Sequence, residues 1–204
     1  MEYKWLFVGL GNPGDQYLNT RHNMGFLTVD RFLELAGTRK SMRLQLLRDV
    51  ADYQLHAMLF AGAPCLLARP LTYMNLSGRA VANICGHHLI KPDQVVIMHD
   101  ELDLELGRIK LKKSGGANGH NGVQSVTDCL NSGEFWRLRL GIGRPSQPGH
   151  MSDFVLDELS AQELELAVAT VDRAVKGLEM FVRRGPGFAQ QALHTPQKPE
   201  ETEP

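Results

Sequence analysis

An unbroken apolar run near the start of the chain, Trp5–Leu10, constrains the fold more than any other feature. A run with no polar alternation is typical of a strand buried on both faces, as in the centre of a parallel sheet. It stops at Gly11–Gly14, where glycine and proline favour a tight turn. A second short strand, Val95–Met98, leads directly into His99-Asp100-Glu101. Both patterns predict buried strands that end in polar segments.

Helical and extended patterns alternate over the rest of the chain. We expect helices capped by Asn23 and by Ser77, and a further helix from His120 to Leu130. The remaining extended segments are Gln45–Val50, Tyr53–Phe60, Cys65–Ala68, a hairpin at Leu104–Lys113 around Gly107, and Trp136–Ile142. This alternation predicts an α/β, single-domain three-layer sandwich, in which a mixed, mostly parallel twisted sheet lies between helices.

The last helix has the clearest signature. Ser160 and Glu163 have the spacing of a capping box, in which each side chain bonds a free backbone donor of the first turn. The helix ends near Gly185, and its apolar stripe is Leu164, Val168, Val171, Val175, Leu178 and Val182. We therefore expect one folded domain at residues 1–194, followed by an acidic, disordered tail at 195–204.

Composition excludes several classes of protein. The 204 residues fit one domain, and the net charge of −1 gives no general attraction for nucleic acid. We find neither an apolar stretch of membrane-spanning length nor a signal peptide, so the expected location is the cytoplasm, with no membrane partner. The three cysteines are far apart and odd in number, which argues against disulfides and favours small buried residues: Cys65, Cys85 and Cys129.

The candidate chemistry lies at strand ends, where ligands bind in parallel sheets. A carboxylate such as Asp100 can hold the imidazole of His22 in one tautomer and make its other nitrogen a better base. The sequence has no G-x-S-x-G motif, and no cysteine stands beside a histidine. A His–Asp pair that activates water is the simplest hydrolytic scheme. His99, Asp100 and His120 match no metal-ligand signature, so we expect no metal.

Three asparagines lie in glycine-flanked or strand-end loops: Asn12, Asn75 and Asn121. An amide can bind a peptide backbone or polarise a carbonyl without adding charge. Each one alone is also compatible with an ordinary turn. The glycine-rich segment 115–119 is not a nucleotide-binding motif, and it suits a flexible loop or a close backbone approach.

Basic residues alternate in two segments. Arg108, Lys110 and Lys112 would share one face of a strand, as would Arg137 and Arg139. Such rows can follow a phosphate backbone, although a solvated sheet face has the same pattern.

Taken together, six segments resemble the bacterial peptidyl-tRNA hydrolase family. They occur in the family's order between about Lys4 and His194, and their combination is far more specific than any one of them. The segments are Val8–Gly14, Thr20–Gly25, Arg69–Gly78, His99–Leu104, Gly115–Gly122 and Arg137–Gly143.

The resemblance implies an enzyme that hydrolyses the ester of peptidyl-tRNA and recycles tRNA from stalled or aborted translation. It implies His22 as the general base and Asp100 as its orienting partner, with no cofactor and no metal, in a monomer that binds the 3′ end and acceptor arm of tRNA. The implied substrate-binding residues are Asn12, Tyr17, Tyr73, Met74, Asn75, His120 and Asn121, and the implied tRNA phosphate contacts are Lys110, Lys112 and Arg139. The alternative is a non-enzymatic tRNA- or ribosome-binding protein of the same fold.

Overall fold

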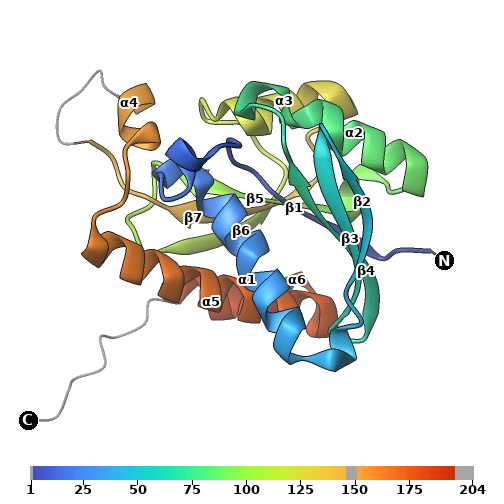
Figure 1. The fold of residues 1–204 in the computed structure, drawn as a ribbon. Helices are drawn as coiled ribbons and strands as arrows, with labels where there is room; N and C mark the ends of the chain where they lie inside the picture. The colour runs from blue at the N-terminus through green and yellow to red at the C-terminus, as the bar shows by residue number, and fades with distance from the viewer. Residues whose placement is uncertain (1, 146–150, 196–204) are drawn as a thin grey trace, which may run out of the picture.

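A seven-stranded sheet forms the centre of the molecule, with strand order β2-β3-β4-β1-β5-β7-β6 (Figure 1). The computed structural model describes residues 2–145 and 151–195, so all of the predicted tail except Thr195 lies outside the described residues. The strands are β1 Trp5–Gly9, β2 Gln45–Val50, β3 Tyr53–Phe60, β4 Ala63–Pro70, β5 Val95–Glu101, β6 Ile109–Lys113 and β7 Trp136–Gly141.

The sheet is mixed, as predicted. Its four central strands, β4, β1, β5 and β7, run parallel, and β2, β3 and β6 are added antiparallel at the margins. Strand β1 has parallel neighbours on both sides, and the side chains of Leu6, Phe7 and Val8 have no exposed surface. Burial on both faces explains why this strand appears in the sequence as an unbroken apolar run.

Helices cover both faces of the sheet. Figure 1 shows α2 and α3 on one side of it and α1, α5 and α6 on the other. Phe7 belongs to the core beneath α1 and α5, whereas Leu6 and Val8 belong to the core beneath α2 and α3, which confirms the three layers. The helices are α1 Met24–Thr38, α2 Ser77–His88, α3 Asn121–Leu130, α4 Met151–Leu156, α5 Ala161–Arg184 and α6 Pro186–His194. Short 3₁₀ helices occur at Asp15–Tyr17, Arg21–Asn23, Lys40–Met42, Met74–Leu76 and Pro92–Gln94.

Two predicted helix caps are wrong, although the helices themselves are present. Asn23 precedes α1, but its side chain bonds the backbone of Asn12 instead of the first turn of the helix. Ser77 lies within the first turn of α2, and its buried hydroxyl has no partner in the described part of the chain. The capping box of Ser160 and Glu163 is confirmed.

The predicted hairpin at Leu104–Lys113 is also wrong. Its second half forms β6, but β6 pairs with β7. Gly107, with a φ of +90°, lies in a turn closed by the bond from the Arg108 amide to the Glu105 carbonyl. The Leu104 carbonyl accepts a hydrogen bond from the Gly143 amide at 2.7 Å. Leu104 is therefore bonded to the residues that follow β7 and not to β6.

The apolar stripe of α5 is confirmed at four of its positions and wrong at Val168, whose side chain is 51% exposed. The middle of the buried face is formed instead by small residues, including Ala167 and Ala174. The helices α4 and α6 were not predicted, although Pro186 directly after Gly185 is a favourable helix start.

All three cysteines are free thiols. Burial raises the pKa of the Cys65 thiol to about 12 and that of Cys85 to about 11, which makes both unreactive. Cys129 is exposed, so its expected burial is wrong. Over the described residues, every helix is too short or too polar to cross a membrane.

Candidate active site

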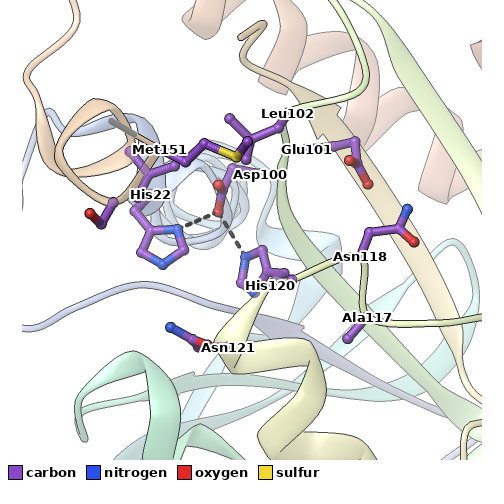
Figure 2. Close-up of a pocket in the computed structure, with 12 residues that line it drawn as sticks. His22, Asp100, Glu101, Leu102, Ala117, Asn118, His120, Asn121 and Met151 are labelled. Atoms are coloured by element: carbon purple, nitrogen blue, oxygen red, sulfur yellow. Dashed lines mark hydrogen bonds and ion pairs between the residues drawn. The ribbon is translucent and has the colours of Figure 1, made fainter. Parts of the chain in front are cut away.

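Three segments distant in the sequence bring His22, Asp100 and His120 together (Figure 2). His22 lies in the 3₁₀ helix directly before α1, Asp100 lies near the carboxyl end of β5, and His120 directly precedes α3. The Nδ1 atom of His22 and the Nε2 atom of His120 each lie 2.9 Å from the same oxygen of Asp100, Oδ1. The predicted His–Asp pair is therefore present, and a second histidine joins it.

The backbone fixes this meeting point. Strands β1 and β5 are parallel neighbours, and beyond β1 the Leu10 amide donates to the Met98 carbonyl at 2.9 Å. The chain then returns at Gly25, where a Cβ would lie 2.3 Å from the Met98 carbonyl oxygen and 2.4 Å from the Leu10 nitrogen. Only glycine permits this approach, which places the first turn of α1, and His22 just before it, against the end of β5.

The hydrogen bonds determine which nitrogen of His22 is available. Burial alone would raise the pKa of Asp100, but the two imidazoles outweigh it and hold that pKa below its ordinary range. The carboxylate accepts, so Nδ1 of His22 donates. The Nε2 atom of His22 makes no hydrogen bond to any described residue. His22 thus presents a free lone pair, as a general base requires.

Both nitrogens of His120 are already bonded within the protein. Its Nδ1 accepts from the backbone amides of Gly122 and Val123, at 3.1 and 3.3 Å, and so caps α3. Its Nε2 therefore carries the hydrogen that it donates to Asp100. A Cβ at Gly122 would lie 2.5 Å from the sulfur of Met74, so glycine lets this turn pack against Met74.

A cavity of about 210 Å³ opens beside the three side chains. Asn121 reaches it from the first residue of α3 and makes no hydrogen bond to any described residue (Figure 2). The lining residues are His22, Asp100, Glu101, Leu102, Ala117, Asn118, Gly119, His120, Asn121, Met151, Ser152 and Val155. Sequence reasoning missed the α4 residues Met151, Ser152 and Val155, because a six-residue helix is too short to show a periodic pattern.

The other predicted substrate-binding residues lie outside that lining. The side-chain oxygen of Asn12 accepts the Met74 amide at 2.8 Å, and its Nδ2 bonds to none of the described residues. Asn12 is therefore held in place with one donor free. Met74 is buried, Tyr73 and Asn75 are exposed, and Tyr17 is half-buried. Met74 joins this group to the cavity, because it contacts the turn that carries Asn121.

A second, cationic cavity of about 40 Å³ shares three lining residues with the first, namely Glu101, Ala117 and Asn118. Lys112 and Arg139 line it. Lys110 pairs with Arg139 across β6 and β7, and Lys112 pairs with the buried Arg137, so these side chains share one face of the sheet, as predicted.

The two arginines differ in their partners. The Nε of Arg139 donates to Glu101 at 2.7 Å. Burial and the neighbouring Arg139 lower the pKa of Arg137, whose Nη1 donates to the Gly116 carbonyl at 2.7 Å. Arg137 therefore anchors the glycine-rich loop to β7.

His99 does not join the candidate metal group that the sequence raised. Its Nδ1 donates to the Asp100 carbonyl at 2.7 Å, and burial, with His120 beside it, lowers its pKa to about 3. The ligand atoms that lie within 4.8 Å of one another belong instead to His22, Asp100 and His120, and they already bond to each other.

Comparisons with known proteins agree on one family. The family model described as "Peptidyl-tRNA hydrolase" matches residues 6–202. Among the curated relatives of that name, the protein of Maridesulfovibrio salexigens is 49% identical over all of both chains, and that of Oleidesulfovibrio alaskensis is 43% identical over 95% of this chain and 98% of its own. A crystal structure of peptidyl-tRNA hydrolase from Acinetobacter baumannii has 33% identity and a TM-score of 0.85, covering 96% of this chain and 97% of that one.

Proposed function

The chain belongs to the peptidyl-tRNA hydrolase family and is an enzyme of that activity, and we propose that His22 is its general base. One observation carries this assignment. Asp100 holds Nδ1 of His22 at 2.9 Å, and Nε2, which bonds to none of the described residues, belongs to a side chain that lines the cavity of about 210 Å³. A neutral imidazole oriented in this way is suited to take a proton from water.

In the proposed reaction, Nε2 of His22 takes a proton from a water molecule as that water attacks the carbonyl carbon of the ester. The resulting imidazolium is stabilised by Asp100 and then gives its proton to the departing ribose oxygen. The products are the free peptide acid and the tRNA with its terminal hydroxyl restored. General-base help of this kind contributes about two to four powers of ten in rate.

Two asparagine amides are positioned to donate to the substrate. Asn12 is fixed through its own side-chain oxygen, which leaves Nδ2 as a preorganised donor toward a carbonyl oxygen of the peptide-bearing end. Asn121 lines the cavity beside His120 with its amide unbonded by described residues. Tyr17, Tyr73, Met74 and Asn75 complete the proposed substrate surface, in which Met74 packs rather than bonds.

The proposed tRNA contacts follow β6 and β7. Lys110 and Lys112 are exposed on β6, opposite Arg139 and Arg137. Glu101, Ala117 and Asn118 line both the cationic cavity and the catalytic one, so phosphates held here belong to the 3′ end and acceptor arm nearest the ester. Glu101 offsets part of the charge of Arg139, which makes the two lysines the main cations. We further propose that the enzyme acts as a cytoplasmic monomer that recycles tRNA from stalled translation.

One assay tests this function. Release of an N-blocked amino acid from tRNA is compared with release of the unblocked amino acid, both in the presence of a chelator. We expect the blocked substrate to be hydrolysed as fast with the chelator as without it. Binding of the tRNA without hydrolysis would favour the non-enzymatic alternative, and loss of activity with the chelator would favour a metal-dependent reaction.

A further inference from the structure

The carboxylate of Asp100 is shared between two imidazoles. Among the described residues, its side chain bonds only His22 and His120, and both bonds end on Oδ1. The carboxylate is 3% exposed, so water does little to hold it. The orientation of the Asp100 carboxylate, which accepts from Nδ1 of His22, therefore depends on His120.

The start of α3 fixes His120 in one tautomer. Two backbone amides point at Nδ1, and a proton on that atom would face both donors and the positive end of the helix. The hydrogen must stay on Nε2, directed at Asp100. His120 therefore donates from Nε2, and a hydrogen on Nδ1 would break the cap of α3.

We propose that His120 is a positioning residue for the His22–Asp100 pair, an inference that rests on the proposed role of His22. It holds the Asp100 carboxylate in the orientation that His22 needs. His120 lines the cavity, but in this proposal it acts through Asp100 and is not the substrate contact that the family resemblance implies.

Two amide substitutions separate the contact of His120 with Asp100 from its cap on α3, because each amide side chain replaces one nitrogen of the ring. The amide oxygen of asparagine lies near the place of Nδ1, so His120→Asn keeps the acceptor for Gly122 and Val123 and loses the donor to Asp100. The amide nitrogen of glutamine lies near the place of Nε2, so His120→Gln keeps the donor and loses the cap. The two variants form a matched pair.

The experiment measures kcat and KM on N-blocked aminoacyl-tRNA, together with the thermal midpoint of each variant. We expect His120→Asn to unfold close to the wild-type temperature, since asparagine caps helices well, and to lower kcat about 10- to 100-fold with KM changed less than about threefold. We expect His120→Gln to unfold at a lower temperature and to recover most of the kcat lost in the asparagine variant.

Three results would overturn the inference: a wild-type kcat in His120→Asn, an equal loss of kcat in both variants, or a raised KM with unchanged kcat, which indicates a substrate contact. The role of His22 is tested separately with His22→Asn. If that variant is inactive while His120→Asn turns over normally, only this inference fails.

Discussion

Asn23 and Asn12 form a reciprocal pair across the turn that follows β1. The side-chain oxygen of Asn23 accepts the Asn12 amide at 2.8 Å, and its Nδ2 donates to the Asn12 carbonyl at 3.1 Å. Asn23 directly follows His22, and the side-chain oxygen of Asn12 binds the Met74 amide. One buried amide therefore ties the general base to the turn that holds the proposed carbonyl donor.

Asn23→Asp should weaken the Asn23–Asn12 pair and, through it, the positions of His22 and Asn12. The aspartate keeps an acceptor for the Asn12 amide but leaves the buried Asn12 carbonyl without its donor, at a cost of about 1–3 kcal/mol. We expect a lower free energy of unfolding in urea together with a lower kcat. Asn19→Asp is the control, because that side chain is exposed. Equal free energies of unfolding for the two variants would show that the reciprocal pair does not stabilise the fold.

Asp100→Asn should slow turnover without abolishing substrate binding. An amide at this position can turn its NH₂ toward His22 and favour the wrong tautomer, with the hydrogen on Nε2. We expect kcat to fall by about two to four powers of ten, with a smaller change in KM. Steady-state kinetics on N-blocked aminoacyl-tRNA measures this. A variant within a few-fold of wild type would mean that Asp100 does not orient the base.

The stability of the protein should depend on pH through His99. Its ordinary pKa is 6.5, and burial lowers the folded-state value to about 3. Below pH 6.5 the unfolded chain binds a proton here that the folded protein does not, so stability present above 6.5 is lost as the pH falls toward 3. Between pH 7.5 and 5.5 this costs about 1 kcal/mol.

His99→Asn isolates that contribution. Its amide nitrogen can still donate to the Asp100 carbonyl, but the side chain does not titrate. Urea unfolding of both proteins at pH 7.5 and 5.5 should show the smaller loss in the variant. The same loss in both would mean that His99 does not titrate differently on folding.

Removing Lys110 and Lys112 should weaken tRNA binding and reduce its salt dependence. Each lost phosphate contact lowers the slope of log affinity against log salt by about one. Binding is measured in the His22→Asn background, so that no substrate is consumed. Lys91→Ala removes another exposed lysine, outside β6 and β7, and serves as the control. A slope equal to that of the control would place the tRNA elsewhere.

The sequence predicted the elements that depend on local patterns. The apolar run of β1, the strands Gln45–Val50 and Tyr53–Phe60, and the capping box of α5 all have local physical causes. The wrong cap at Asn23 has a tertiary origin. A polar side chain before a helix is a cap only if no stronger partner lies nearby, and for Asn23 the distant backbone of Asn12 takes its place.

The site could be predicted only in part for a similar reason. His22 and Asp100 followed from strand-end placement and from the family resemblance, and their contact is confirmed. The bond from His120 to Asp100 depends on the angle at which α3 meets β5, which no sequence pattern records. The cavity wall from α4 depends on tertiary packing alone.

The most direct measurement of the whole account is a single-turnover assay of His22→Asn with N-blocked aminoacyl-tRNA, alongside its affinity for that substrate. An asparagine at this position cannot take a proton from water. We predict wild-type affinity with hydrolysis reduced by at least about two powers of ten. Near-normal hydrolysis in this variant would contradict the account.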